Sequence, residues 1–127
     1  MEQALLLEVR DDLLQIKTKE IPWHESESHL KQITAALNVE LVDVVSAEMD
    51  EHVYTTDIWV DDESLLKPPT PIIQASVGDR TMFLLAGWRF LVLTSKDGVS
   101  HGLTEQRIKD IKERFRYKYI GMHGETE

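Results

Sequence analysis

A chain of 127 residues with 42% hydrophobic side chains has enough apolar material for one domain, and its lack of cysteine excludes disulfides, thiolate nucleophiles and Cys-based metal sites. Its formal charge of −9 is unevenly distributed, because residues 20–63 contain twelve carboxylates and one cation, Lys31, a local charge of −11. Such a segment repels phosphates, so direct binding to duplex DNA is not expected and the segment should face solvent or a cationic partner.

The apolar segments predict a cytoplasmic protein. Residues 4–7 form a short apolar cluster between Glu2 and Glu8, without the cationic region that begins a signal peptide. The longest apolar stretch, residues 82–93, contains Arg89 and is shorter than the ~20 residues that span a bilayer. Neither secretion nor membrane insertion is expected.

Two β-hairpins and a helix are predicted in the first half of the chain. Residues 4–9 and 14–19 pair in the first hairpin, and residues 41–45 and 53–60, rich in β-branched and aromatic side chains, pair in the second. Residues 26–37 between them have the apolar spacing of one helical face.

Capping residues bound this first helix. Ser26 or Ser28 can accept a hydrogen bond at its N-terminus, and Asn38 can end it. Its predicted buried stripe consists of Leu30, Ile33 and Leu37.

The second half of the chain alternates strands with turn signals. The proline-rich residues 67–71 predict a rigid connector that is neither helix nor central strand. Three strands are expected after it, at residues 72–77, 81–86 and 89–94. Asp97-Gly98 predicts a turn.

A second amphipathic helix is expected at the end of the chain. Thr104 caps it, Gly121 ends it, and residues 121–127 form a frayed tail. Its apolar stripe, expected to share one core with that of the first helix, consists of Ile108, Ile111 and Phe115. These elements predict a single α+β domain over residues 1–127, with a mainly antiparallel sheet of about five to six strands and two amphipathic helices.

No metal or cofactor is expected. His24 and His29 are five residues apart, whereas the helical zinc motif places two histidines four apart with a glutamate after the first. The triplet Asp61-Asp62-Glu63 lacks the alternating ligands and the glycine of a calcium loop. Both segments are interpreted as solvated and acidic.

The sequence also predicts a protein that is not an enzyme. It contains no Gly-x-Ser-x-Gly elbow, no Ser-x-x-Lys pair and no glycine-rich phosphate loop. His52 and His101 could serve a hydrolase together with carboxylates, but no spacing supports that arrangement.

Arg89 lies inside an apolar strand, where alternation directs it away from Trp88 and Phe90. A structural ion pair with a carboxylate of the acidic segment is the favoured role. The alternative is a small pocket in which Trp59, Trp88 and Arg89 bind an anionic aromatic molecule such as a nucleotide.

The order of signals from Ile58 to Phe115 resembles a family of small uncharacterised domains from bacteriophages, plasmids and Gram-positive bacteria. The resemblance is carried by a strand ending in residues 61–63, the proline link at Pro69, and a glycine, Gly87, before an apolar strand. It implies a phage or mobile-element accessory protein, for which binding and blocking a host factor is the expected activity.

Two functions therefore follow from the sequence. In the first, the acidic surface docks on a cationic, nucleic-acid-binding site of a host protein in the host cytoplasm and mimics phosphate charge. Its expected partner-binding residues are Asp57, Asp61, Asp62 and Glu63. In the second, the tryptophan and arginine pocket sequesters an anionic small molecule.

Overall fold

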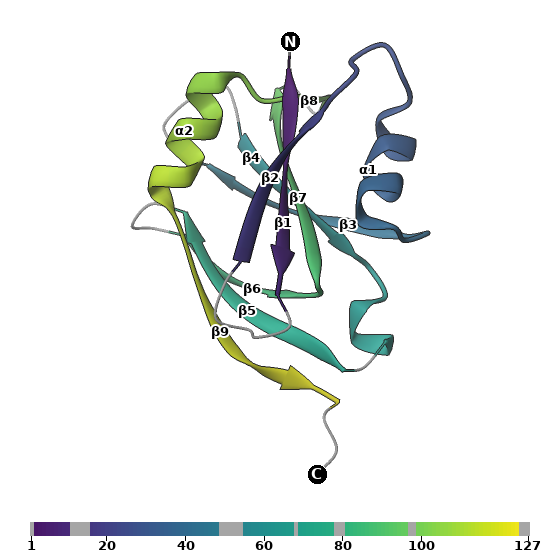
Figure 1. Ribbon diagram of the computed structural model, residues 1–127, viewed down its shortest axis with the longest axis vertical. Helices are drawn as coiled ribbons and strands as arrows, with labels where there is room; N and C mark the ends of the chain where they lie inside the picture. The colour runs from purple at the N-terminus through teal and green to yellow at the C-terminus, as the bar shows by residue number, and fades with distance from the viewer. Residues whose placement is uncertain are drawn as a thin grey trace.

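The chain folds into two antiparallel sheets and two helices (Figure 1). The computed structural model describes residues 2–10, 16–48, 55–67, 69–77, 81–96 and 99–124. An α+β fold with mainly antiparallel strands was predicted, and this class is confirmed. The predicted turn at Asp97-Gly98 and the strand residues Leu14 and 53–54 lie outside the described residues.

The larger sheet contains both predicted hairpins. The first is β1 (Gln3–Val9) with β2 (Ile16–Pro22), and the second is β3 (Val42–Glu48) with β4 (Thr55–Asp61). Strand β7 (Arg89–Lys96) joins them, so that the order is β2-β1-β7-β4-β3. A short strand, β8 (Val99–His101), also pairs with β7.

The smaller sheet has the order β6-β5-β9, with β5 (Thr70–Val77) at its centre, β6 (Thr81–Ala86) on one side and β9 (Phe115–His123) on the other. The described part of the chain therefore has nine strands, more than the five to six expected.

Both helices begin at the predicted caps. The Ser28 hydroxyl accepts from the backbone N–H of Lys31 at 3.3 Å before α1 (His29–Leu37), which ends at Asn38 in the left-handed conformation (φ 57°). The Thr104 hydroxyl accepts from the N–H of Arg107 at 3.2 Å before α2 (Glu105–Arg114).

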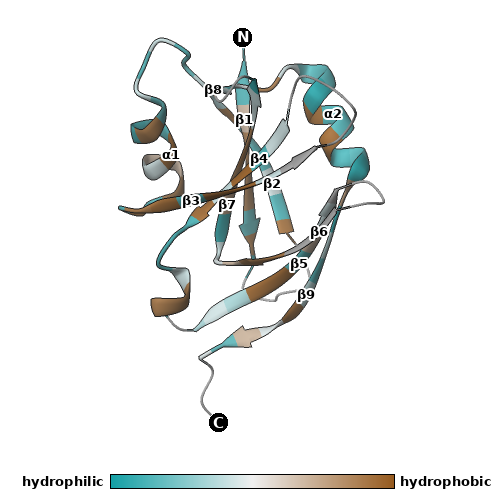
Figure 2. Cartoon of the chain, turned by 180° about the vertical axis from the view of Figure 1, so that it is seen from behind, coloured by the Kyte–Doolittle hydropathy of each residue, from teal (hydrophilic) through white to brown (hydrophobic). Residues whose placement is uncertain are grey.

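Sheet β2-β1-β7-β4-β3 separates two hydrophobic cores. Alternation along β1 sends Leu5 and Leu7 to the core shared with α2 and the smaller sheet, and sends Ala4 and Leu6 to the core shared with α1. Figure 2 shows the resulting mixture of hydrophobic and hydrophilic segments on both helices. The prediction that the two helices share one core is therefore wrong, because a sheet lies between them.

The α1 stripe is also narrower than predicted. Ile33 and Leu37 are buried, but Leu30 is 60% exposed. Leu30 lies in the first helical turn, and only the later part of the stripe enters the core.

The end of the chain differs most from the prediction. Helix α2 stops at Arg114, and Phe115 adopts an extended conformation that starts β9. This strand pairs with β5 up to His123, so residues 121–123 belong to a sheet rather than to a frayed tail. Residues 125–127 lie outside the described residues.

The proline link is partly regular structure. Ser64–Leu66 form a short 3-10 helix, η1, and Thr70 and Pro71 begin the central strand β5, contrary to the prediction for this segment. Pro71 is tolerated there because it stands at the start of the strand, where its carbonyl accepts from the N–H of Gly87 at 3.1 Å.

Candidate functional site

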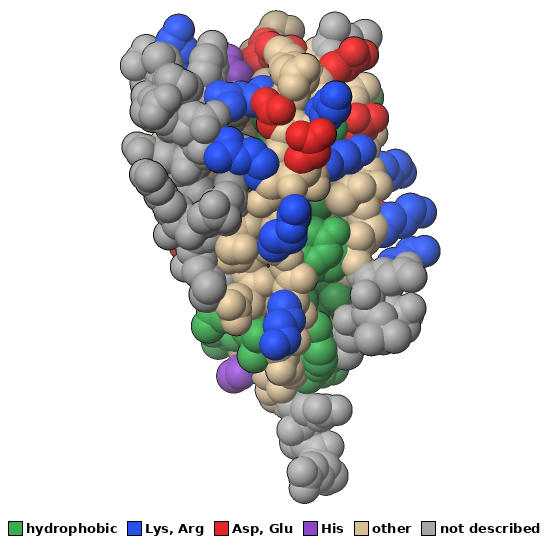
Figure 3. Space-filling view, turned by 90° about the vertical axis from the view of Figure 1, so that its left-hand side faces the viewer, with side chains coloured by type: hydrophobic (Ala, Val, Ile, Leu, Met, Phe, Trp, Pro, Cys, Tyr) green, Lys and Arg blue, Asp and Glu red, His purple; other side chains and the backbone are tan. Residues whose placement is uncertain are grey.

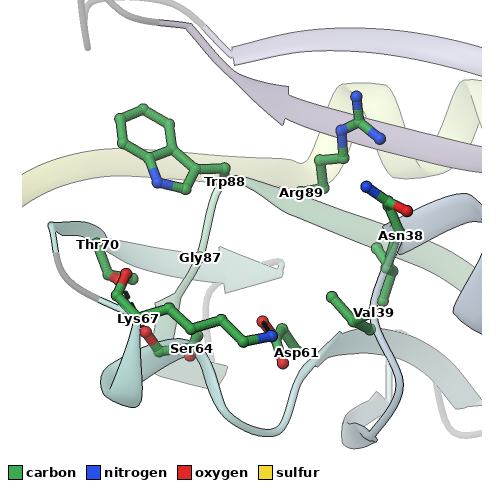
Figure 4. A pocket seen from close by; sticks show the side chains of 10 residues that line it. Asn38, Val39, Asp61, Ser64, Lys67, Thr70, Gly87, Trp88 and Arg89 are labelled. Atoms are coloured by element: carbon green, nitrogen blue, oxygen red, sulfur yellow. Dashed lines mark hydrogen bonds and ion pairs between the residues drawn. The ribbon is translucent and has the colours of Figure 1, made fainter.

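A hollow of about 240 Å³ lies where four parts of the chain meet (Figure 4). They are the C-terminal end of α1, the end of β4 with η1, the start of β5, and the turn between β6 and β7. The lining residues are Leu37, Asn38, Val39, Asp61, Ser64, Lys67, Thr70, Gly87, Trp88 and Arg89. The fold thus brings together segments that lie far apart in the sequence.

Asp61 and Thr70 hold one wall of the hollow rigid. One Asp61 oxygen accepts from the N–H of Glu63 at 2.9 Å, and the other accepts from the Lys67 ammonium at 3.0 Å. The buried Thr70 hydroxyl donates to the carbonyls of Ser64 at 2.7 Å and Lys67 at 2.9 Å. These bonds preorganise η1 and the carboxylates beside it.

The electrostatic field at this wall is negative. The hydrogen bond from Lys67 to Asp61 raises the pKa of Lys67. Desolvation opposes this shift, and the charges of Asp61, Glu63 and Glu40 add to it. Three carboxylates therefore act on one ammonium group. Asp62, next to Asp61, is exposed to solvent.

The opposite wall is formed by the tight turn from β6 to β7. Gly87 has a φ of 144°, a conformation that side-chain-bearing residues rarely adopt. After it, the Trp88 indole N–H donates to the carbonyl of Pro69 at 3.3 Å, and Arg89 lies 3.6 Å from the Glu8 carboxylate. In Figure 4 the Arg89 side chain points away from Lys67 and Asp61.

The three residues predicted to form a ligand pocket are separated. Trp88 and Arg89 line the hollow, whereas Trp59 packs in the core shared with α1. An ion pair was predicted for Arg89 and is present, but its partner Glu8 lies on β1, outside the acidic segment 20–63. The adjacent pairing of β1 with β7, which sets Glu8 opposite Arg89, explains the difference.

The four predicted partner-binding carboxylates also differ in environment. Asp57 is only 4% exposed, and one of its oxygens accepts from the hydroxyls of Ser46 at 2.7 Å and Thr55 at 3.1 Å. It is not part of an exposed surface, because β4 lies between β3 and β7 and the two hydroxyls bond the carboxylate. Asp61 lines the hollow, and Asp62 and Glu63 follow it directly in the chain.

Exposed apolar side chains lie on the segments around the hollow, and among them only Trp88 was expected at a site from the sequence. Leu65 and Leu66 on η1 are 50% and 77% exposed, and Trp88 is 37% exposed. The short helix is one of the hydrophobic segments at the surface in Figure 2. The carbonyl of the exposed Leu41 accepts from the N–H of Asp62, which places a further apolar residue beside the carboxylates.

A second polar cluster was missed by sequence reasoning. The Glu25 carboxylate accepts from the N–H of Gly102 at 2.9 Å and lies 3.6 Å from both His29 and His101. Residues 24–28 are exposed, as the interpretation of a solvated segment expects, but Glu25 also bonds to the backbone just after β8. Its contacts join residues about 77 positions apart, which no local motif reveals.

Glu2 completes this cluster. The pKa of Glu2 is raised mainly by its interaction with Glu25 and also by burial. Its Oε2 atom is buried and has no hydrogen-bond partner within ordinary distance and angle. Burial opposes ionisation of Glu25. Its pKa is nevertheless lowered, because Glu2 and the Gly102 backbone form hydrogen bonds with it and His101 lies nearby. Within the described ranges no group of three or more His, Asp or Glu side chains is arranged to hold a metal ion. His52 lies outside those ranges.

Comparison with protein-family models, with curated proteins and with solved structures finds no match to this chain. The resemblance to the phage and plasmid domains therefore stays a prediction. No helix in the described part of the chain is long and apolar enough to cross a membrane.

Proposed function

We propose that this chain is a non-enzymatic binding protein that docks a cationic segment of a partner protein in its acidic hollow. The acidic hollow is the cavity between η1 and the β6–β7 turn, which Asp61 lines, together with the nearby carboxylates of Glu40, Asp62 and Glu63. The observation that supports this proposal is a preformed cavity whose two lining cations, Lys67 and Arg89, are each paired with a carboxylate, while Glu40 and Glu63 add negative charge near Lys67.

A cationic guest suits this site better than an anionic one. The Lys67 ammonium is already bonded to Asp61, and Arg89 is directed to Glu8. An incoming lysine or arginine would instead find carboxylate oxygens with remaining acceptor capacity, and such charge-assisted hydrogen bonds are among the stronger ones.

The apolar rim indicates that the guest is a protein segment. Leu65, Leu66 and Trp88 can bury area against an aliphatic or aromatic side chain, while the carboxylates contact its basic neighbours. An interface of apolar anchors surrounded by charge is typical of protein recognition.

The partner class follows from the charge and from the resemblance. A phage or mobile-element accessory protein in the host cytoplasm would meet basic, nucleic-acid-binding sites of host proteins. Carboxylates at the acidic hollow would occupy the positions of phosphates there and block the site. Long-range attraction would speed the encounter and weaken as salt is added.

A labelled peptide that alternates lysine and leucine tests the proposal by fluorescence anisotropy. The test variant is Glu40→Gln/Asp62→Asn/Glu63→Gln, which leaves Asp61 in place because it holds η1. The matched control, Glu20→Gln/Glu27→Gln/Glu105→Gln, removes three exposed carboxylates elsewhere.

At low salt we expect the test variant to bind about tenfold more weakly than the parent chain, because each lost ion pair contributes ~0.2–1 kcal/mol. The control variant should bind within about twofold of the parent. Equal weakening in both triple variants would mean that the net charge, not the hollow, attracts the peptide.

Binding of an anionic aromatic ligand is the second candidate, since Trp88 and Arg89 line the same hollow. A nucleotide titration separates the two. If ATP quenches the parent's fluorescence and Trp88→Phe abolishes the quenching, while the basic peptide does not bind, the ligand function is favoured.

A further inference from the structure

The C-terminal part of the chain has the opposite charge to the rest. Residues 105–123 contain six cations and three carboxylates, a local charge of +3 in a chain of −9. The cations are Arg107, Lys109, Lys112, Arg114, Arg116 and Lys118. Figure 3 looks onto this side and shows Lys and Arg side chains over most of its length, on both sides of a hydrophobic strip, with Asp and Glu confined to its upper end.

A second hollow, of about 150 Å³, opens on this side between the two sheets. Leu5, Leu7, Ile111 and Phe115 supply apolar surface, and Thr18, Lys112 and Tyr117 complete its lining. An apolar cavity of this volume accommodates one six-membered ring.

Tyr117 is placed to stack on such a ring. Its side chain is 40% exposed, and its ring lies 5.6 Å from that of Phe115 at an interplanar angle of 51°. Tyr117 therefore has one neighbour that fixes it and a free surface toward solvent, as in aromatic platforms on which bases stack.

Cations lie at the hollow and on the strands that border it. Lys112 lines the hollow directly. Arg116 and Lys118 adjoin Tyr117 on β9, and Lys17 and Lys19 adjoin Thr18 on β2; alternation turns these four side chains to the outer faces of the two edge strands. Within the described residues the four lysines form no ion pair with a carboxylate. Arg116 donates to two backbone carbonyls, those of Glu113 and Phe115, which leaves its charge uncompensated.

We propose that this basic hollow binds single-stranded nucleic acid, with one base inserted beside Tyr117 and the neighbouring phosphates held by Lys112, Arg116 and Lys118. A planar ring with an apolar face, followed by regularly spaced negative charges, is the chemistry of a nucleotide chain. A paired base cannot leave its stack without cost, so duplex should bind more weakly than a single strand. The site goes beyond the proposed function, because it lies on different elements from the acidic hollow.

Fluorescence anisotropy with a labelled single-stranded oligothymidine tests this inference. The same strand annealed to its complement and a labelled acidic peptide with one tyrosine serve as competing probes. Tyr117→Ala removes the stacking surface and Tyr117→Phe keeps it. Lys112→Gln/Lys118→Gln removes two cations of the site, and Lys31→Gln, on α1, is the control for loss of a distant charge.

We expect the single strand to bind more tightly than the duplex and the peptide. Tyr117→Ala should weaken binding about tenfold and Tyr117→Phe less than about threefold. The double lysine variant should reduce the slope of log affinity against log salt by about 1.4, and Lys31→Gln should leave that slope unchanged. Circular dichroism of each variant checks that the fold is intact.

The inference is overturned by any of three results. The first is equal affinity for duplex and single strand, which would mean phosphate attraction without base insertion. The second is equal binding by Tyr117→Ala and the parent chain. The third is tighter binding of the acidic tyrosine peptide than of the oligothymidine.

Discussion

Two glutamates with opposite pKa shifts share one polar cluster. The pKa of Glu2 is raised, so the folded chain binds this proton more readily than the unfolded chain. Glu2 therefore contributes fully to stability when the pH is below its pKa in the unfolded chain. This contribution is lost as the pH rises through its pKa in the folded chain. Glu25 has a lowered pKa. Its contribution to stability is present when the pH is above its pKa in the unfolded chain, and is lost as the pH falls through its pKa in the folded chain.

Glutamine substitutions at these two positions should therefore act in opposite directions at neutral pH. Glu2→Gln removes an unfavourable charge and should raise the free energy of unfolding at roughly pH 7, with the gain shrinking toward pH 4. Glu25→Gln should lower it, because Gly102 and His101 lose their carboxylate partner. Urea denaturation across this pH range measures both effects. Loss of stability in Glu2→Gln at pH 7 would show that the ionised form of Glu2 is the favoured one.

Gly102 is required by close packing. A Cβ atom at this position would stand 2.7 Å from both the Cβ of Glu2 and the Cδ1 of the buried Trp23. Gly102→Ala should therefore destabilise the fold by ~1–3 kcal/mol, the usual effect of overpacking. Gly121→Ala is the matched control, since a Cβ there meets nothing within 4 Å. Chemical denaturation of both variants checks this, and equal midpoints would contradict it.

At the scale of elements, the two helices bury different amounts of their predicted stripes. Ile111 of α2 is 2% exposed and lies in the core between the sheets, so Ile111→Ala should destabilise the fold by ~2–5 kcal/mol. Leu30→Ala on the exposed start of α1 should cost less than ~0.5 kcal/mol. A loss below about 1 kcal/mol for Ile111→Ala would mean that the α2 stripe does not pack as described.

Local signals explain which elements could be predicted. The Ser28 and Thr104 caps and the two hairpins depend on neighbouring residues, and both kinds of feature are confirmed. Strand β9 could not be separated from α2, because Phe115 fits the helical stripe of Ile108 and Ile111 as well as the strand alternation with Tyr117. Pairing with β5 decides between them, and β5 is about forty residues away.

The site was predictable only in part for the same reason. Asp61 to Glu63 are adjacent in sequence and stay together, and Trp88 and Arg89 follow Gly87 into the hollow. Asp57 and Trp59 lie on the same strand, β4, but Asp57 is buried and the partly buried Trp59 packs against the core shared with α1, so neither lines the hollow. Their environment depends on the strands and the helix packed around β4, which alternation alone does not specify.

At the scale of the whole molecule, the two proposed sites have opposite charge and lie on different elements. The acidic hollow lies at the end of β4, and the basic hollow lies between α2, β9 and the first hairpin. This separation allows a cationic protein segment and a single-stranded nucleic acid to bind without sharing side chains. Because both associations are led by charge, both should weaken as the salt concentration rises.

The most direct test of the acidic hollow is a ¹⁵N NMR titration of the chain with the lysine and leucine peptide. We predict shifts of the backbone amides of residues 61–67 and of the Trp88 indole N–H, which lines the hollow. The indole of Trp59, packed against α1, provides an internal control and should not move. An unchanged Trp88 indole, with shifts confined to residues 112–118 or absent, would contradict the proposal that this hollow docks a cationic partner.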